Sequence, residues 1–121
     1  METAQNIKDR TFAFALNIVN FSNGLPTLQA SQRLSDQLVR SGTSVGANVE
    51  EATAASSRND FVYKVNIALR EAREANYWLR LVKGTKINNS DQLDCLLAES
   101  EELKKILGAI VSKARGKRKV A

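Results

Sequence analysis

The segment from Arg40 to Ala52, RSGTSVGANVEEA, has two glycines four positions apart among serine and threonine. A glycine-rich loop of this composition could bind a phosphate group. A phosphate-binding loop, however, needs a lysine followed by serine or threonine after its second glycine, and a dinucleotide-binding fingerprint needs a preceding strand. Gly46 is followed by alanine and asparagine, and the residues on both sides have helical spacing. The segment is therefore predicted to be the middle of a helix and not a phosphate site.

Carboxylates are the second group of residues that could do chemistry. Glu50, Glu51, Glu71 and Glu74 are of the type that holds di-metal centres in helical bundles, but those centres also use Glu-x-x-His pairs. The chain has no histidine and a single cysteine, Cys95, so neither a di-metal centre nor a zinc or iron site is expected. Cys95 lies near a leucine stripe and is predicted to be a small core residue, not a nucleophile. We expect no catalytic residue, no metal and no cofactor, and hence a protein that is not an enzyme.

Polar residues of the same region follow helical spacing and share a face. They are Gln37, Arg40, Ser44, Asn48 and Glu51, and an antiparallel neighbouring helix would bring Lys64, Arg70, Arg73 and Glu74 to a similar level. A buried asparagine or carboxylate without partners costs several kcal/mol. One interpretation is a structural network, centred on Asn48, Glu51, Arg70 and Glu74, that fixes helix register or lines a subunit interface. The other interpretation is a ligand-binding or catalytic site.

Glycines inside a helix need an explanation, because each costs about 1 kcal/mol relative to alanine. Small residues around Gly42 and Gly46 would let another helix approach closely. Bulky residues of the third predicted helix, namely Tyr63, Tyr77 and Trp78, are the expected neighbours. The sequence therefore predicts close helix packing at both glycines.

Positive charge is concentrated at the C-terminal end. The chain has 18 lysine and arginine residues and 13 aspartate and glutamate residues, a net charge of +5. All acidic residues precede Lys113, and the tail that follows carries Lys113, Arg115, Lys117, Arg118 and Lys119. A neutral body with a basic tail is compatible with an electrostatic contact to nucleic acid. The alternative is a solvated helix end, where cations suit the helix dipole.

Hydrophobic periodicity predicts four helices, at about residues 4–22, 29–56, 58–84 and 90–113, and no strands. The first should end at Asn23-Gly24 before Pro26, and Ser57 and Ser90 should cap the third and fourth. We therefore expect an all-α fold, an antiparallel up-down-up-down four-helix bundle of residues 1–112, followed by a basic tail of residues 113–121.

The first predicted helix is apolar around much of its circumference. Its main stripe is Ile7, Thr11, Phe14, Ile18 and Phe21, and Phe12, Leu16 and Val19 widen it. Although residues 11–32 carry no charge, they include asparagine, glycine and proline, whereas a membrane span needs about 20 mostly apolar residues. We expect no membrane span and a cytoplasmic protein. The extra apolar surface predicts self-association.

Two segments, QLVRSGTSVGANVEEA and SRNDFVYKVNIALREAREANYWLRLV, resemble a known family. It is the four-helix-bundle family encoded in intervening sequences of bacterial large-subunit ribosomal RNA genes, which includes the accessory variability proteins of diversity-generating retroelements. The motif comprises Arg40, Ser41, Thr43, Ser44, Ala47, Asn48 and Glu51, with Ala68, Leu69, Glu71 and Ala72 on the next helix. Many members have glycine where this chain has Ala52.

The resemblance implies more than the periodicity does. It implies a ring-shaped homopentamer and, from the retroelement members, binding to nucleic acid and to a reverse transcriptase. Candidate contacts with RNA or DNA are the five tail cations together with Arg40, Arg70 and Arg73. The family-motif residues Arg40, Ser44, Asn48, Glu51, Glu71 and Glu74 are expected to form a structural network. Two functions stay open: a non-enzymatic oligomer that binds nucleic acid, and a protein-interaction scaffold.

Overall fold

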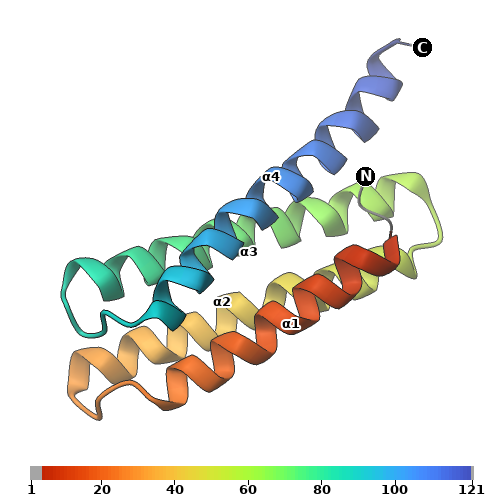
Figure 1. Ribbon diagram of the computed structural model, residues 1–121. Coiled ribbons are helices and arrows are strands. Elements are labelled where there is room, and N and C mark those ends of the chain that lie inside the picture. The colour runs from red at the N-terminus through yellow and green to blue at the C-terminus, as the bar shows by residue number, and fades with distance from the viewer. Residues whose placement is uncertain (1–3, 121) are drawn as a thin grey trace.

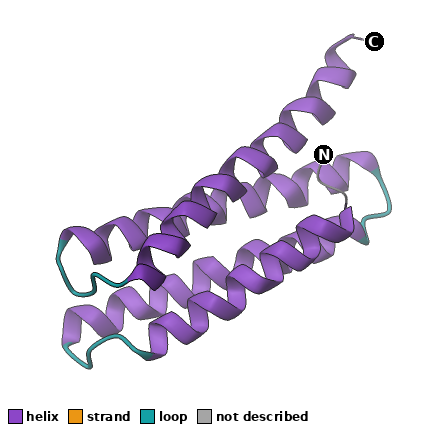
Figure 2. Ribbon diagram, in the orientation of Figure 1, coloured by secondary structure: helices purple, strands orange, loops and turns teal. Residues whose placement is uncertain are grey.

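The structure is a computed structural model that describes the backbone of residues 4–120 and the side chains of residues 5–116. It contains four helices: α1 (Ala4–Asn23), α2 (Gln29–Thr53), α3 (Arg58–Gly84) and α4 (Asp91–Val120). Consecutive helices run in opposite directions, and no strand occurs in residues 4–120 (Figures 1 and 2). The predicted all-α four-helix bundle is confirmed.

The helices form a ring of four neighbouring pairs in which the pairing is uneven. The contacts of α2 with α3 are the most extensive, followed by those of α1 with α2 and α3 with α4, whereas α1 and α4 touch much less. The core lies on the ring axis. In α1 the whole predicted stripe is buried, from Ile7 at 5% exposure to Ile18 at 0%, and the Thr11 hydroxyl donates to the Ile7 carbonyl oxygen over 2.8 Å.

Two helix boundaries differ from those expected from the sequence. Helix α2 ends at Thr53 instead of near residue 56, because Ser57 adopts an extended conformation to cap α3 and accepts a hydrogen bond from the Asp60 amide at 3.1 Å. Helix α4 begins after Ser90, whose hydroxyl accepts from the Leu93 amide, and continues to Val120 instead of ending near residue 113. Lysine and arginine are good helix formers and no proline interrupts this segment.

Gly42 and Gly46 lie inside α2 with ordinary right-handed dihedrals, and both face a neighbouring helix at close range. The predicted neighbour was wrong, however. A β-carbon added at Gly42 would lie 2.9 Å from the Ile18 side chain, and one at Gly46 would lie 3.2 Å from the Thr11 carbonyl oxygen. The glycines therefore accommodate α1 and not the aromatic residues of α3.

The aromatic residues of α3 lie elsewhere. Tyr63 and Tyr77 are 62% and 47% exposed, and the half-buried Trp78 donates its indole N–H to Glu74 over 3.1 Å. Periodicity assigns residues to a buried stripe but does not say which neighbouring helix each residue meets. For that reason the sequence predicted close packing of α2 against α3 at the two glycines, whereas α2 packs closely against α1 there.

Candidate nucleic-acid interface

The C-terminal turns of α4 leave the bundle and project past the other three helices (Figure 1). Val111 is the last buried residue of α4 in the described part of the chain, and the side chains of Lys113 and Arg115 are exposed. The side chains of Lys117, Arg118 and Lys119 lie outside the described residues. The basic segment is thus carried on a continuous helix, beyond the point where packing ends.

Cations earlier in α4 are neutralised by that helix's own carboxylates. Lys104 pairs with Glu101 at 3.2 Å and Lys105 with Glu102 at 3.4 Å, each three residues apart. The hydrogen bond from Lys104 lowers the pKa of the exposed Glu101, and desolvation opposes this effect. Because Glu102 is the last acidic residue in the sequence, Lys113 and the cations after it have no aspartate or glutamate three or four positions away, the spacing at which helical ion pairs form.

Arg40, by contrast, forms ion pairs with two carboxylates across the α2–α3 interface. Its guanidinium forms an ion pair with Glu74 and lies 3.4 Å from Glu71, and Glu74 also accepts the Trp78 indole N–H. The structure therefore brings Arg40, Glu71 and Glu74 together as one cluster. An arginine held by two carboxylates has little remaining attraction for phosphate.

The other family-motif residues do not join that cluster. The Ser44 hydroxyl donates to the Arg40 carbonyl oxygen at 2.7 Å, and the half-buried Asn48 amide donates to the Ser44 carbonyl oxygen at 2.9 Å. Both bonds stay within α2, and they satisfy the polar atoms locally. Glu51 is exposed and forms no ion pair with a described residue.

Arg70 and Arg73 are exposed on the outer side of α3. Neither forms an ion pair or a side-chain hydrogen bond with any described residue, so both guanidinium groups are available to an anion from solution. Of the three body arginines considered from the sequence, these two are exposed and have no ion pair with a described residue. Arg40 has ion pairs with Glu71 and Glu74.

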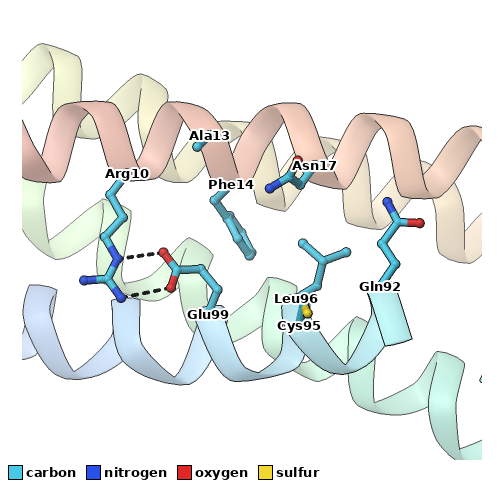
Figure 3. Close-up of a pocket in the computed structure, with 8 residues that line it drawn as sticks. All are labelled: Arg10, Ala13, Phe14, Asn17, Gln92, Cys95, Leu96 and Glu99. Carbon is cyan, nitrogen blue, oxygen red and sulfur yellow. Dashed lines mark hydrogen bonds and ion pairs between the residues drawn. The ribbon is translucent and has the colours of Figure 1, made fainter. Parts of the chain in front are cut away.

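A cleft of about 400 Å³ lies between α1 and α4 (Figure 3). Arg10 and Glu99 cross it with two hydrogen bonds of 2.7 and 2.9 Å, and Asn17, Gln92 and Cys95 line it further along. The prediction that Cys95 belongs to the core was wrong, because its thiol is exposed. Cys95 lies outside the buried stripe of Leu93, Leu96 and Leu103, at the edge where α4 faces the cleft.

Sequence reasoning missed one buried polar contact. Asn76 is 1% exposed, and its amide donates to the Ser100 hydroxyl at 2.8 Å, which links α3 to α4. The Asn76 carbonyl oxygen accepts from the Arg80 Nε at 3.0 Å within α3. Ser100 lies in the sequence between Leu96 and Leu103, and a serine among buried leucines was the available signal that a polar partner faced it. Among residues 5–116, no group of histidine, cysteine or acidic residues could hold a metal ion.

No helix in the described part of the chain has the length and hydropathy to span a membrane. Residues 4–109 match the profile of the family described as 23S rRNA-intervening sequence protein. A similar solved structure is a protein with unknown function from the S23 ribosomal protein family of Bacteroides thetaiotaomicron. It is 41% identical, with a TM-score of 0.83, over 90% of this chain and 97% of that one. No curated protein matches the sequence.

Proposed function

The chain belongs to the family of 23S rRNA-intervening sequence proteins, and we propose that it is a non-enzymatic, self-associating bundle that binds nucleic acid in the cytoplasm. The contact is made by the C-terminal end of α4 and is indifferent to base sequence. The observation that carries this proposal is the projecting basic helix, in which no aspartate or glutamate follows Glu102 in the sequence. Every such cation that meets a phosphate releases counterions, which supplies the binding free energy.

Self-association strengthens a contact of this kind. Phe12 and Leu16 are 60% and 51% exposed on α1, and Phe12 borders an apolar groove of about 390 Å³ between α1 and α2 that also includes Ala15 and Ala47. Exposed apolar surface favours association. In the homopentamer that the family resemblance implies, five basic ends would act together, and multivalent attachment can raise avidity by about 10²-fold or more.

The test is a salt titration of fluorescent RNA and DNA oligonucleotides against the wild-type chain and a variant with all five tail cations changed to glutamine. Glutamine keeps the helix and removes the charge, so affinity at low salt should fall for every oligonucleotide while the oligomer persists. The matched control is Lys104→Gln with Lys105→Gln, which removes cations already paired with carboxylates and should leave affinity nearly unchanged. Equal affinity of the tail variant and the wild type would refute the proposal.

A second candidate function is a protein-interaction scaffold without nucleic-acid binding, with a reverse transcriptase as one possible partner. The exposed Phe12 and Leu16 favour it, because the same surface could receive another protein instead of a second copy. Failure of the wild-type chain to bind any oligonucleotide at low salt would favour this scaffold function.

A further inference from the structure

The outer face of α3 carries two tyrosines and three arginines in one stripe. Tyr63 and Tyr77 are 62% and 47% exposed, and Arg70, Arg73 and Arg80 are exposed as well. At 3.6 residues per turn these five positions fall within about 100° of the helix circumference. Both aromatic side chains are thus interleaved with cations on one face.

A cation also lies over each ring. The Lys64 ammonium is 5.9 Å from the centre of the Tyr63 ring, and the Arg80 guanidinium is 5.6 Å from the centre of the Tyr77 ring. The Trp78 ring meets Tyr77 edge-on, with the ring centres 5.1 Å apart. These contacts hold Tyr77 in place, and the planar guanidinium of Arg80 extends the surface on which a base can stack.

The stripe is positively charged without compensation from its own residues. Arg70 and Arg73 have no ion pair with a described residue. The carboxylates that border the stripe are Glu74 on the α2 side and Glu101 on the α4 side. Each already pairs with a cation from another position, so neither neutralises the two arginines.

The spacing of the aromatic residues matches a short single strand. Tyr63 and Tyr77 are about four helical turns apart, or ~21 Å, which equals roughly six nucleotides at ~3.4 Å each. Arg70 lies midway between the two rings and Arg73 lies nearer to Tyr77. A strand that stacks bases on both rings would therefore carry its phosphates past both arginines.

From this arrangement, and resting on the nucleic-acid binding proposed above, we propose that the α3 face binds single-stranded RNA. Bases stack on Tyr63 and Tyr77, and the phosphates between them contact Arg70 and Arg73. The side chains of an acidic peptide would satisfy the arginines but have no aromatic ring to stack on the tyrosines. A duplex would satisfy the arginines too, but its bases are already stacked on one another and cannot reach the rings.

RNA fits this face better than DNA because of the polar groups beside the rings. Asn66 lies on the same side of α3 between Tyr63 and Arg70, and an amide both donates and accepts hydrogen bonds, as do the two phenol hydroxyls. The ribose 2′-hydroxyl likewise donates and accepts, and it is the group by which a protein distinguishes RNA from DNA.

The experiment compares two double variants that both lack the phenol hydroxyls: Tyr63→Leu with Tyr77→Leu, which removes the aromatic rings, and Tyr63→Phe with Tyr77→Phe, which keeps them. The probe is a fluorescent oligouridylate of ~12 nucleotides, within the range of known single-strand site sizes. The leucine variant should lose at least ~5-fold in affinity for this RNA, the phenylalanine variant should retain most of it, and duplex binding should not change. Exposed positions tolerate these changes, and thermal melting checks that each variant is folded.

Charge is tested separately. Arg70→Gln with Arg73→Gln should reduce the slope of log affinity against log salt by about 1.4 for the single strand, while Arg33→Gln, an exposed arginine of α2, should not change it.

A 5-iodouridine oligonucleotide should crosslink on irradiation to Tyr63 or Tyr77. Oligothymidylate should bind more weakly than RNA, and polyglutamate should not compete.

The result that overturns the inference is equal RNA affinity of the leucine variant and the wild type, or competition by polyglutamate that equals competition by RNA. Equal binding of DNA and RNA overturns the choice of RNA. For each tyrosine variant, the quantity compared is the difference between its affinity for the single strand and its affinity for the duplex. A loss confined to the single strand can therefore be told apart from failure of the tail proposal. Neutralising the tail should instead lower affinity for both kinds of nucleic acid together.

Discussion

Replacing Gly42 with alanine should destabilise the protein, although alanine is the better helix former. The change gains about 1 kcal/mol of helix propensity. The added β-carbon, however, would lie 2.9 Å from two carbons of Ile18, which is fully buried and branched close to its backbone. Overpacking of a tight core costs about 1–3 kcal/mol, so we expect a net loss of up to about 2 kcal/mol.

The chain provides matched controls for this prediction. A β-carbon at Gly108, inside α4, would meet nothing within 4 Å, so Gly108→Ala should stabilise by the full propensity gain of about 1 kcal/mol. Gly46→Ala should fall between the two, since its β-carbon would lie 3.2 Å from the Thr11 carbonyl oxygen and α1 must shift by a few tenths of an ångström. Gly46→Leu, which is much larger, should cost about 1–3 kcal/mol.

The assay is urea unfolding followed by Trp78 fluorescence and circular dichroism at several protein concentrations, because self-association would add to apparent stability. A double-mutant cycle with Ile18→Ala isolates the contact with the two γ-carbons: the penalty of Gly42→Ala should become smaller in that background, although the β-carbon of residue 18 would still lie 3.1 Å from the added one. If Gly42→Ala is as stable as Gly108→Ala, the close approach of α1 to α2 is not what requires glycine at this position.

The remaining predictions concern a buried polar contact and an exposed apolar face. Asn76→Ala should cost about 1–3 kcal/mol in urea unfolding, because it removes the hydrogen bond that links α3 to Ser100, whereas Arg80→Ala should cost much less because Arg80 is exposed. Equal losses for the two variants would contradict this reasoning. Phe12→Glu with Leu16→Glu should convert the oligomer to a 13.3 kDa monomer by light scattering without unfolding it, since both side chains are more than half exposed. A wild-type chain that is already monomeric at micromolar concentration would refute self-association.

Periodicity was sufficient for the fold class and for most of the core. The stripe of α1 is buried at every predicted position, and Ser57 and Ser90 cap the helices that they were expected to cap. These features depend on local spacing and on hydrogen bonds within a few residues. Such information is contained in a short window of sequence.

Features that depend on which helix lies next to which were harder to predict. Gly42 and Gly46 were correctly assigned to close packing, but their neighbour is α1, and Cys95 is exposed although a leucine stripe runs close by in the sequence. The partner of Arg40 depends on the relative height of α2 and α3, which spacing within one helix does not determine. The candidate interface had the same difficulty: Tyr63 and Tyr77 were expected to pack inside, and their exposure is visible only once the helices are assembled.

The uneven pairing around the ring has a mechanical consequence. The α2–α3 interface is the most extensive in the bundle, whereas α1 and α4 meet along a weak interface that the Arg10–Glu99 ion pair crosses. No loop connects α1 directly to α4, since α1 is the first and α4 the last helix of the described chain. Tension applied between α1 and α4 would therefore separate these two helices contact by contact, while the α2–α3 interface carried little of the load.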